Sequence, residues 1–487
     1  MSTPATDRIP LPGAQPPAEP APPSQKTVNV TIAVLAFSAF VMILNETVLS
    51  IAMPPLMRDF AVGETTVQWL TTGFLLTMAV VIPTTGYLLQ RYTVRRLFIV
   101  ALSLFLLGTT LAILAPSFGV MLAARVLQAG GTAIIMPLLM TTTLTLVAPQ
   151  RRGAVMGLNS IVISVGPAIG PTVSGAIIDL LSWRWVFGLM VPIALVVLLI
   201  GLRFMPALGG GGRARLDIPS VFLSLFGFGG LVTAVSTLTD LSRGSFIAPI
   251  SLVIGIIGVV LFVVRQRRLQ ADGGRALLDL SAFQVRNFRL AVIVIMVAKG
   301  ALLGTVVVIP ILAQTGLGLS VLATGMLLLP GGIVQGVLAP FVGRLYDRFG
   351  PKPLVVPGAI LLSGAQWWLS TIQADTPVWT ITAMHVTFSI GMALIQTPMM
   401  THALGSLPRH QVGHGSAIFN TLQQLGGAAG TAALVGALAI GASLSGIADG
   451  GAQIAGAHLA FVVGGVLTLV AVICAPMLSR EDAPAGR

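Results

Sequence analysis

The chain has 487 residues, of which 55% are hydrophobic and only 9% are charged. Water-soluble domains carry roughly 25% charged residues, and so few charges would leave large apolar patches facing water. This composition excludes a soluble globular protein, and it excludes a disordered chain, which needs low hydrophobicity. The single cysteine, Cys474, excludes a disulfide framework and a cysteine-rich metal site.

The first 27 residues differ from everything that follows. They are rich in proline and contain almost no large apolar side chains, a composition that cannot bury a core. We interpret residues 1–27 as a disordered tail. Apolar sequence begins only after Val28 and continues far enough to cross a bilayer, unlike the short apolar stretch of a secretory signal. The first helix is therefore expected to remain in the mature protein.

Fourteen apolar runs, bounded by charged residues, proline or glycine, predict fourteen membrane-spanning helices. A span needs about 20 apolar residues, because the hydrocarbon layer is about 30 Å thick and a helix rises 1.5 Å per residue. The predicted spans are residues 30–53, 68–89, 97–115, 119–147, 155–180, 185–205, 218–240, 246–264, 289–312, 320–343, 353–372, 377–402, 414–441 and 456–478. We therefore predict an all-α polytopic membrane protein.

The basic residues predict the orientation. With the N-terminus inside, nearly all of the 27 Lys and Arg residues fall in the tails and in the turns on the same side. Arg58, Arg184 and Arg243 fall on the other side, and Arg125 and Lys299 lie within spans. The positive-inside rule then places both termini in the cytoplasm. Because the net charge of +12 would lie beside anionic lipid, it argues against a nucleic-acid partner.

Two segments of the chain resemble each other. GYLLQRYTVRR begins at Gly86 and GRLYDRFGPKP begins at Gly343, each after the second helix of its half. The spacing between them fits six helices plus two inserted ones, and transporters commonly place a binding site between such repeats. We predict an N-terminal six-helix bundle at 28–206 and a linker with two additional spans and a basic cytoplasmic loop at 207–287. A C-terminal bundle at 288–479 and a cytoplasmic tail at 480–487 complete the chain.

Six motifs lie in order on the expected helices. They are LNETVLSIAMP from Leu44, WLTTGFLL from Trp69, the two cytoplasmic loops above, Arg125 with Gln128, Gly130 and Gly131, GPAIGP from Gly166, and WRWVF from Trp183. With these motifs the chain resembles the major facilitator superfamily. Within it, the chain is similar to the fourteen-helix drug:proton antiporters, especially the lincomycin-resistance type of multidrug exporter.

The resemblance implies a fold and an activity. The fold is the major facilitator fold, with two six-helix bundles and two inserted helices. The activity is proton-coupled efflux of lipophilic, often cationic compounds by alternating access across the bacterial cytoplasmic membrane. A proton would be the coupling ion, no cofactor is implied, and the protein is expected to be a monomer.

The resemblance also implies a charge cluster that closes the cytoplasmic side between the two halves. Its members would be Arg91, Arg95, Arg96, Asp347 and Arg348. Gln90 stands where the first loop of the family usually carries Asp, so the cluster is expected to depend mainly on the second loop.

The fifth-helix signature supplies a candidate gating hinge at Gly166, Pro167, Gly170 and Pro171. Small residues permit close contact between helices, and proline permits a bend. A static close-packing motif is the alternative interpretation.

Glu46 is the leading candidate for proton coupling. It lies roughly midway along the first span, where an acid costs about 2.5–3.5 kcal/mol on insertion scales and therefore usually serves an ion or proton pathway. Ionised, it could hold a cationic substrate; protonated, it could not. Asn45 beside it could orient the carboxyl or face a different helix. The alternative is a permanently protonated carboxyl that bonds to a neighbouring helix.

Three other polar residues within spans are candidates for function. Arg125 needs a carboxylate or carbonyl partner, and the resemblance implicates it in proton coupling with Glu46, whereas a structural pairing is the alternative. Lys299 could bind an anion, repel a cation or extend toward an interface. His385 could titrate near neutral pH or make a structural hydrogen bond.

Aromatic, methionine and amide side chains would suit an adaptable apolar substrate cavity. The candidates are Phe37, Phe40, Trp69, Phe74, Gln128, Met136, His385, Gln396, Asn420 and Gln424. Each Phe or Met can equally face lipid or a neighbouring helix.

Enzyme signatures are absent from the sequence. There is no nucleotide-binding G-x-x-x-x-G-K-[ST] loop, no H-E-x-x-H motif and no paired Cys/His spacing for a metal. We therefore predict no catalytic residues. Two alternatives to a drug exporter stay open: a translocase of lipids or lipid-linked metabolites on the same fold, and a non-transporting membrane scaffold.

Overall fold

The computed structural model describes residues 24–67, 69–210, 217–237, 246–271, 276–446 and 450–479. Within these ranges the chain is built from helices and connecting turns. Most of the predicted tail at 1–27, the whole of the tail at 480–487, and Arg243 lie outside the described residues.

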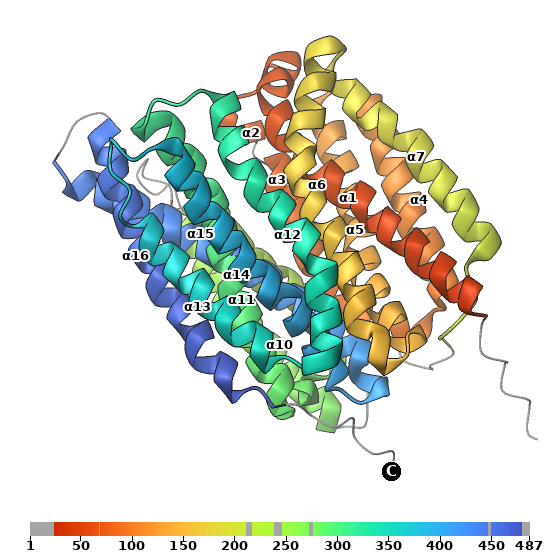
Figure 1. The fold of residues 1–487 in the computed structure, drawn as a ribbon. Coiled ribbons are helices and arrows are strands. Elements are labelled where there is room, and N and C mark those ends of the chain that lie inside the picture. The colour runs from red at the N-terminus through yellow and green to blue at the C-terminus, as the bar shows by residue number, and fades with distance from the viewer. Residues whose placement is uncertain are drawn as a thin grey trace, which may run out of the picture.

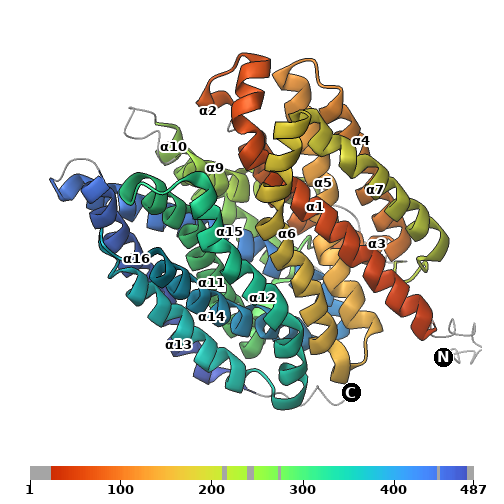
Figure 2. The same cartoon turned by 45° about the horizontal axis from the view of Figure 1, so that its top comes forward.

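Six long helices form the N-terminal bundle, shown in red to yellow in Figures 1 and 2. They are α1 (Gln25–Phe60), α3 (Trp69–Arg91), α4 (Val94–Ile113), α5 (Phe118–Leu146), α6 (Arg152–Leu180) and α7 (Trp183–Phe204), with the short α2 (Glu64–Val67) and η1 (Pro149–Arg151) between them. Polar residues start two of these helices: Ser24 accepts the backbone N–H of Thr27, and Thr93 accepts that of Arg96.

Six more long helices form the C-terminal bundle, shown in green to blue. They are α11 (Arg286–Ile311), α12 (Val321–Phe349), α13 (Lys352–Leu369), α14 (Val378–Gly405), α15 (Val412–Leu444) and α16 (Gly450–Cys474), with the short η4 (Leu280–Gln284), η5 (Leu312–Gly316), η6 (Arg409–Gln411) and η7 (Ala475–Met477). Gly350 ends α12 with a φ of 79°, a left-handed conformation that favours glycine.

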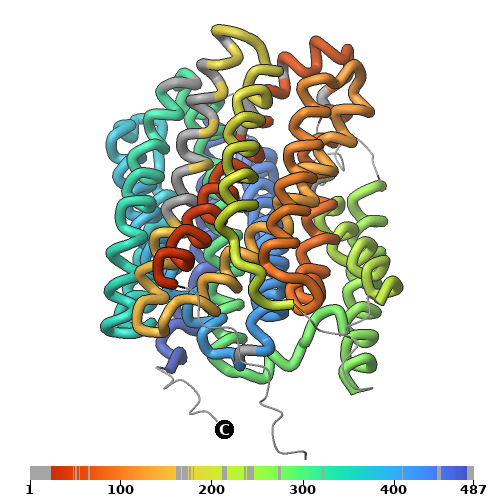
Figure 3. Tube along the Cα trace, turned by 90° about the vertical axis from the view of Figure 1, so that its right-hand side faces the viewer, coloured from red at the N-terminus to blue at the C-terminus, as the bar shows by residue number. Residues whose placement is uncertain are grey.

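The inserted segment between the bundles consists of α8 (Ile218–Ser224), the π-turn η2 (Leu225–Gly229), α9 (Gly230–Ser236) and α10 (Ile247–Ala271). Both η2 and α9 contact α3, and α9 also contacts α15. The inserted helices therefore cover one seam between the bundles, and Figure 3 shows this green segment at the edge of the molecule. At the other seam α6 packs along α12, between the two sets of helices in Figure 1.

Eleven helices in the described part of the chain are long and apolar enough to cross a membrane. The three remaining predicted spans, 155–180, 218–240 and 353–372, are helical as α6, as α8 to α9 and as α13, but they are not among the eleven. An all-helical membrane fold is thus confirmed, and the count of fourteen crossings stays a prediction.

The basic loops predicted on one side of the membrane come together at one end of the molecule, which we call the basic end. It contains the C-terminal ends of α3, α10 and α12 and the N-terminal ends of α6 and α15. Hydrogen bonds join these ends, since Asp347 links α12 to α6 and Gln90 links α3 to α15. The end of α10 joins them because Gln270 bonds to Asp279 and Ser281 bonds to Gln411, the residue before α15.

Candidate functional site

Arg125 on α5 is the centre of a buried polar network in the N-terminal bundle. Its side chain is 1% exposed. One guanidinium nitrogen donates to Asn45 Oδ1 and to Gln128 Oε1, both at 2.9 Å, and Nε donates to the carbonyl of Leu70 at 3.5 Å. The guanidinium carbon lies 4.3 Å from the centre of the Phe74 ring, within the range of a cation–π contact. This set of partners satisfies a cation that is otherwise costly to bury.

The network continues to two further helices. Gln128 Nε2 donates to Thr109 Oγ1 of α4 at 3.2 Å, and Asn45 Nδ2 lies 3.3 Å from the sulfur of Met190 on α7. Gly108 allows α4 to approach this closely, because a Cβ there would lie 2.7 Å from the carbonyl oxygen of Ala124. Five helices of the bundle, α1, α3, α4, α5 and α7, are therefore joined around Arg125.

Glu46 is adjacent to Asn45 but does not belong to this network. Its side chain is half-buried, and it makes no hydrogen bond with another described residue. It interacts electrostatically with Arg125 and with Lys299, which is half-buried on α11 of the other bundle. Glu46 therefore interacts with both of the cations predicted within spans. Arg125 acts on Glu46 through its charge alone, while its side-chain hydrogen bonds go to Asn45 and Gln128.

Glycines of α6 hold that helix against the part of α1 that carries Glu46. A Cβ on Gly166 would lie 2.9 Å from the side chain of Ile43, and one on Gly170 would meet the hydroxyl of Thr47. The α6 helix continues through Pro167 and Pro171, whose side chains lie outside the description. Gly166 and Gly170 of the GPAIGP signature thus pack closely on α1, and the role of the signature as a hinge stays a prediction.

The C-terminal bundle repeats this arrangement around Lys299. Gly300, the next residue on α11, packs directly on Gly426 and Gly430 of α15. In each bundle, therefore, the first long helix places a charged residue beside the surface where a glycine-rich helix packs on it.

Asp347 links the two bundles at the basic end. Its carboxylate oxygens accept the backbone N–H groups of Gly153 at 2.7 Å and Ala154 at 2.8 Å, in the first turn of α6. A helix N-terminus favours a negative charge because its first N–H groups lack partners within the helix. Gly153 and Gly343 let the two helices approach closely here, since a Cβ on either would meet the backbone of the other.

Gln90, which stands in place of an acid in the first loop, makes a different contact between the bundles. Its Nε2 lies 2.6 Å from His414 Nε2 on α15. Two further links lie nearby: Thr397 donates to Ser160 at 2.8 Å, and Asn420 Nδ2 lies 3.3 Å from the sulfur of Met140. These contacts join α3, α5 and α6 to α14 and α15.

The predicted basic members of the cluster lie at the surface of the basic end. Arg95 donates to the carbonyl of Leu202 at 2.6 Å and so binds within its own bundle. The guanidinium of Arg348 lies 5.2 Å from the ring centre of Phe349. Arg91 and Arg96 are exposed at the ends of α3 and α4. Of the predicted cluster, Asp347 accepts hydrogen bonds from the other bundle.

The substrate-cavity candidates of the N-terminal bundle fall into two groups. Phe74 and Gln128 are fully buried in the network of Arg125. Phe37 and Trp69 are 46% and 41% exposed. Phe37 packs on the half-buried Phe40 with ring centres 6.1 Å apart, and Met136 is also half-buried.

The substrate-cavity candidates of the C-terminal bundle are mostly buried. Gln396 accepts a hydrogen bond from Gln335 at 3.1 Å, and Gln424 is half-buried. His385 is 5% exposed, its Nδ1 has no hydrogen-bond partner in the described chain, and it stacks on Phe388.

Sequence reasoning missed the partners of several candidates. Thr109 and Met190 complete the network of Arg125, and Gln335 pairs with Gln396. Polar residues inside apolar runs were a usable signal for Thr109 and Gln335, whereas nothing distinguishes Met190 from other methionines. Among the described residues no group of His, Cys, Asp and Glu side chains could hold a metal ion.

Comparison with known proteins places the chain in a family. Residues 35–431 match the model of the Major Facilitator Superfamily. The chain is 37% identical over 467 residues to lincomycin resistance protein LmrB of Bacillus subtilis, covering 93% of this chain and 96% of that one. It is 36% identical over 457 residues to the protein of the same name in Listeria monocytogenes, covering 92% and 96%.

Solved structures agree on the fold. The human organic anion transporter MFSD10 superposes with a TM-score of 0.66 at 16% identity, covering 92% of this chain and 99% of that one. The transporter FucP, in its outward conformation, gives a TM-score of 0.62 at 16% identity, covering 93% and 100%. With a family match over most of its length, close relatives and this fold, the chain belongs to the Major Facilitator Superfamily of membrane transporters.

Proposed function

We propose that this protein is a proton-coupled antiporter that exports lipophilic, often cationic drugs by alternating access. The relatives that share 36–37% of its sequence over nearly its whole length bear the name lincomycin resistance protein, which supports a drug as the substrate. Their names do not identify the coupling ion, so the coupling is argued from the residues of this chain.

The observation that carries the proposal is the environment of the Glu46 carboxyl. A half-buried carboxyl that makes no hydrogen bond with another described residue, and that two cations influence, is free to exchange a proton or a cationic ligand. Arg125 is held by Asn45 and Gln128, so it does not occupy the Glu46 carboxyl with a direct hydrogen bond. Lys299 on the opposite bundle also interacts with Glu46, and alternating access would change the distance between them.

These residues support a simple cycle. In the inward-facing state Glu46 is ionised and binds a cationic drug from the cytoplasm or the inner leaflet. After the bundles rock, a proton from outside neutralises Glu46 and the drug leaves. The protonated carrier returns and releases its proton inside. Exchange of one proton for one monovalent cation moves no net charge, so the pH gradient supplies about 1.4 kcal/mol per unit.

The same proposal sets the orientation. The protein would cross the bacterial cytoplasmic membrane fourteen times, with the basic end and both termini in the cytoplasm. It would act as a monomer in the lipid bilayer, with protons and small lipophilic or cationic molecules as its ligands and without a cofactor or nucleic acid.

A drug-driven proton flux tests the proposal. The full chain is reconstituted in liposomes that contain a pH-sensitive dye, and a lipophilic cation is added on one side with the membrane potential clamped. Wild-type protein should move protons against the drug, and Glu46→Gln should abolish that flux. The matched control is Asp59→Asn, the same change of acid to amide at the far end of α1, where Asp59 pairs with Arg184 at 2.7 Å. Undiminished proton flux in Glu46→Gln would refute the role of Glu46, and drug movement without protons in wild type would refute the coupling.

A further inference from the structure

A cavity of about 610 Å³ lies at the basic end, outside the site already described. One wall is α10, which contributes Val263, Arg267 and Gln270. Their spacing of four and three residues places them on one face of the helix. The opposite wall is η4 with the first turn of α11. The volume lies in the range of small-molecule sites, about 300–1,000 Å³.

The polar lining of this cavity is basic. Arg267 and Arg289 both line it and are exposed. Arg289 donates one hydrogen bond, to the carbonyl of Phe283 at 3.3 Å, and Arg267 has no hydrogen bond or ion pair with a described residue. No carboxylate is among the described lining residues. The two guanidinium groups therefore retain most of their donors for an anion, and guanidinium geometry suits phosphate.

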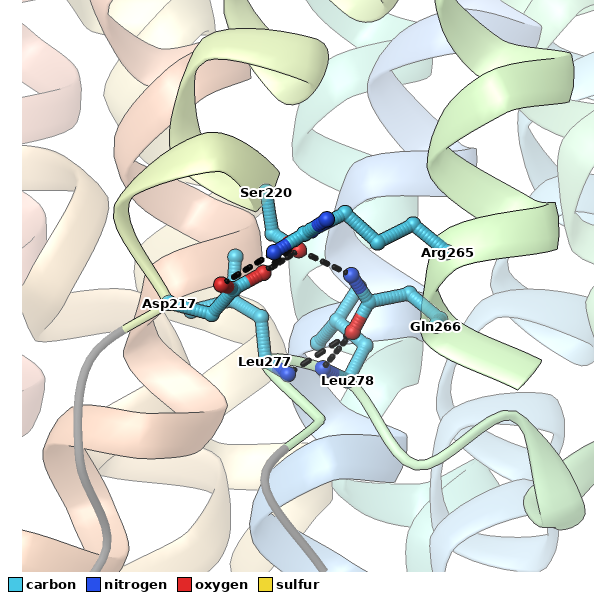
Figure 4. A network of polar contacts seen from close by, with 6 residues as sticks. All are labelled: Asp217, Ser220, Arg265, Gln266, Leu277 and Leu278. Carbon is cyan, nitrogen blue, oxygen red and sulfur yellow. Dashed lines mark hydrogen bonds and ion pairs between the residues drawn. The ribbon is translucent and has the colours of Figure 1, made fainter. Parts of the chain in front are cut away.

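The walls of the cavity are held in place by the polar network in Figure 4. Gln266 on α10 is fully buried, and its side-chain oxygen accepts the backbone N–H groups of Leu277 at 2.7 Å and Leu278 at 3.1 Å. Asp217 fixes the other side of α10 through two hydrogen bonds from Arg265, at 2.7 and 2.8 Å. The segment that leads into η4 is thus tied to α10, so the cavity is a built feature of the inserted segment.

One more hydrogen bond supports this wall and engages Asp279, an acid that directly precedes η4. Gln270 Nε2 donates to Asp279 Oδ1 at 2.7 Å, and the same oxygen accepts the backbone N–H of Ser281 at 2.9 Å. The carboxylate of Asp279 is therefore engaged by neutral donors, and no carboxylate among the described residues forms an ion pair with either arginine.

The remaining lining is apolar and continues onto a face that suits lipid chains. Val263, Leu280 and Phe283 line the cavity, and α10 exposes large apolar side chains along most of its length, from Ile247 to Val264. A ligand with an anionic head at the arginines and a hydrocarbon tail along α10 would match both parts. Basic pockets between helices on the cytoplasmic side recognise anionic lipid headgroups in this way.

We propose that this cavity binds the phosphate headgroup of an anionic phospholipid from the leaflet at the basic end. Arg267 and Arg289 hold the phosphate, Gln284 and Gln270 border the headgroup, and the acyl chains lie along α10. The lipid is a bound component of the inserted segment and not a transported substrate. This inference goes beyond the proposed function, and its test needs no transport.

Native mass spectrometry of the delipidated full chain tests the proposal. The protein is titrated with phosphatidylglycerol or with phosphatidylcholine in matched detergent, and lipid adducts are counted. Wild type should bind phosphatidylglycerol in preference to phosphatidylcholine. The double variant Arg267→Gln/Arg289→Gln should bind phosphatidylglycerol about 30-fold more weakly, because two arginine–phosphate contacts are lost. The matched control is Arg268→Gln/Arg286→Gln, which removes two exposed arginines of the same helices outside the cavity.

The proposal would be overturned if both double variants lost phosphatidylglycerol binding equally. It would also be overturned if wild type bound the two lipids equally. Millimolar inorganic phosphate is a further arm, and displacement of the lipid by phosphate would assign the site to a free anion instead. Phe283→Ser distinguishes the contribution of the acyl chains from that of the headgroup. It should weaken binding of phosphatidylglycerol while leaving any phosphate binding unchanged. Size-exclusion profiles and unfolding temperatures confirm that each variant is folded.

Discussion

Replacing Asp347 with asparagine tests whether its contact between the bundles keeps the basic end closed. The carboxylate accepts N–H groups of Gly153 at 2.7 Å and Ala154 at 2.8 Å. Hydrogen bonds to a charged group contribute about 1.5–3 kcal/mol, but Asp347 is half-buried and solvent screens part of this. We expect Asp347→Asn to remove about 1–2 kcal/mol in all. Since 1.4 kcal/mol is a factor of ten, the ratio of open to closed protein at the basic end should rise about 5- to 30-fold.

Cysteine labelling measures this ratio. Asn420 is 9% exposed and lies beside Met140 of the other bundle, so a cysteine introduced by Asn420→Cys, in a chain with Cys474→Ser, should react slowly with a maleimide while the basic end is closed. The labelling rate is measured in vesicles that expose the basic end. Asp347→Asn should accelerate it 5- to 30-fold, whereas the control Asp59→Asn should not. A rate within twofold of the parent would refute the reasoning.

Two further predictions concern the inserted segment. Gln266→Leu leaves the N–H groups of Leu277 and Leu278 without their acceptor, so the free energy of unfolding should fall by about 2–4 kcal/mol. Unfolding followed by tryptophan fluorescence in detergent measures this, with the exposed Gln25→Leu as control, and equal stability of the two variants would contradict it. The hydrogen bond from Arg265 is the main cause that lowers the pKa of Asp217 below its usual 3.8. The ionised carboxylate therefore stabilises the fold above that value, and this contribution is lost as the pH falls through the lowered pKa. Asp217→Asn should unfold at a lower temperature than wild type at pH 7, with a gap that closes below about pH 3.8; a gap independent of pH would disprove the assignment.

Hydropathy and charge predicted the helices well, because burial in lipid and the positions of basic residues act on each segment separately. The ends of the helices were harder to predict from the sequence. The first helix runs from Gln25 to Phe60 instead of 30–53, since a helix continues past the hydrocarbon layer where its caps allow. The span predicted at 218–240 contains a π-turn at Leu225–Gly229, where Gly227 packs on the backbone of α10.

The candidate site was predictable as a set of residues but not as a set of contacts. A charged residue within an apolar run is conspicuous in the sequence, so Glu46, Arg125 and Lys299 could be chosen as candidates. The choice of Asn45, and not Glu46, as the direct partner of Arg125 depends on how α1 is rotated against α5. That rotation is fixed by packing at Ile43 and Thr47 against α6, which a single sequence does not reveal.

The position of the inserted helices makes the protein's two flanks unequal. One seam between the bundles, at α3 and α15, is screened by η2 and α9, whereas the seam at α6 and α12 carries no such screen in the described chain. A molecule dissolved in the membrane that enters laterally as the bundles separate would then have one route of entry, between α6 and α12. The two bundles would thus be related by symmetry, although lipid-dissolved molecules would reach the space between them from one side only.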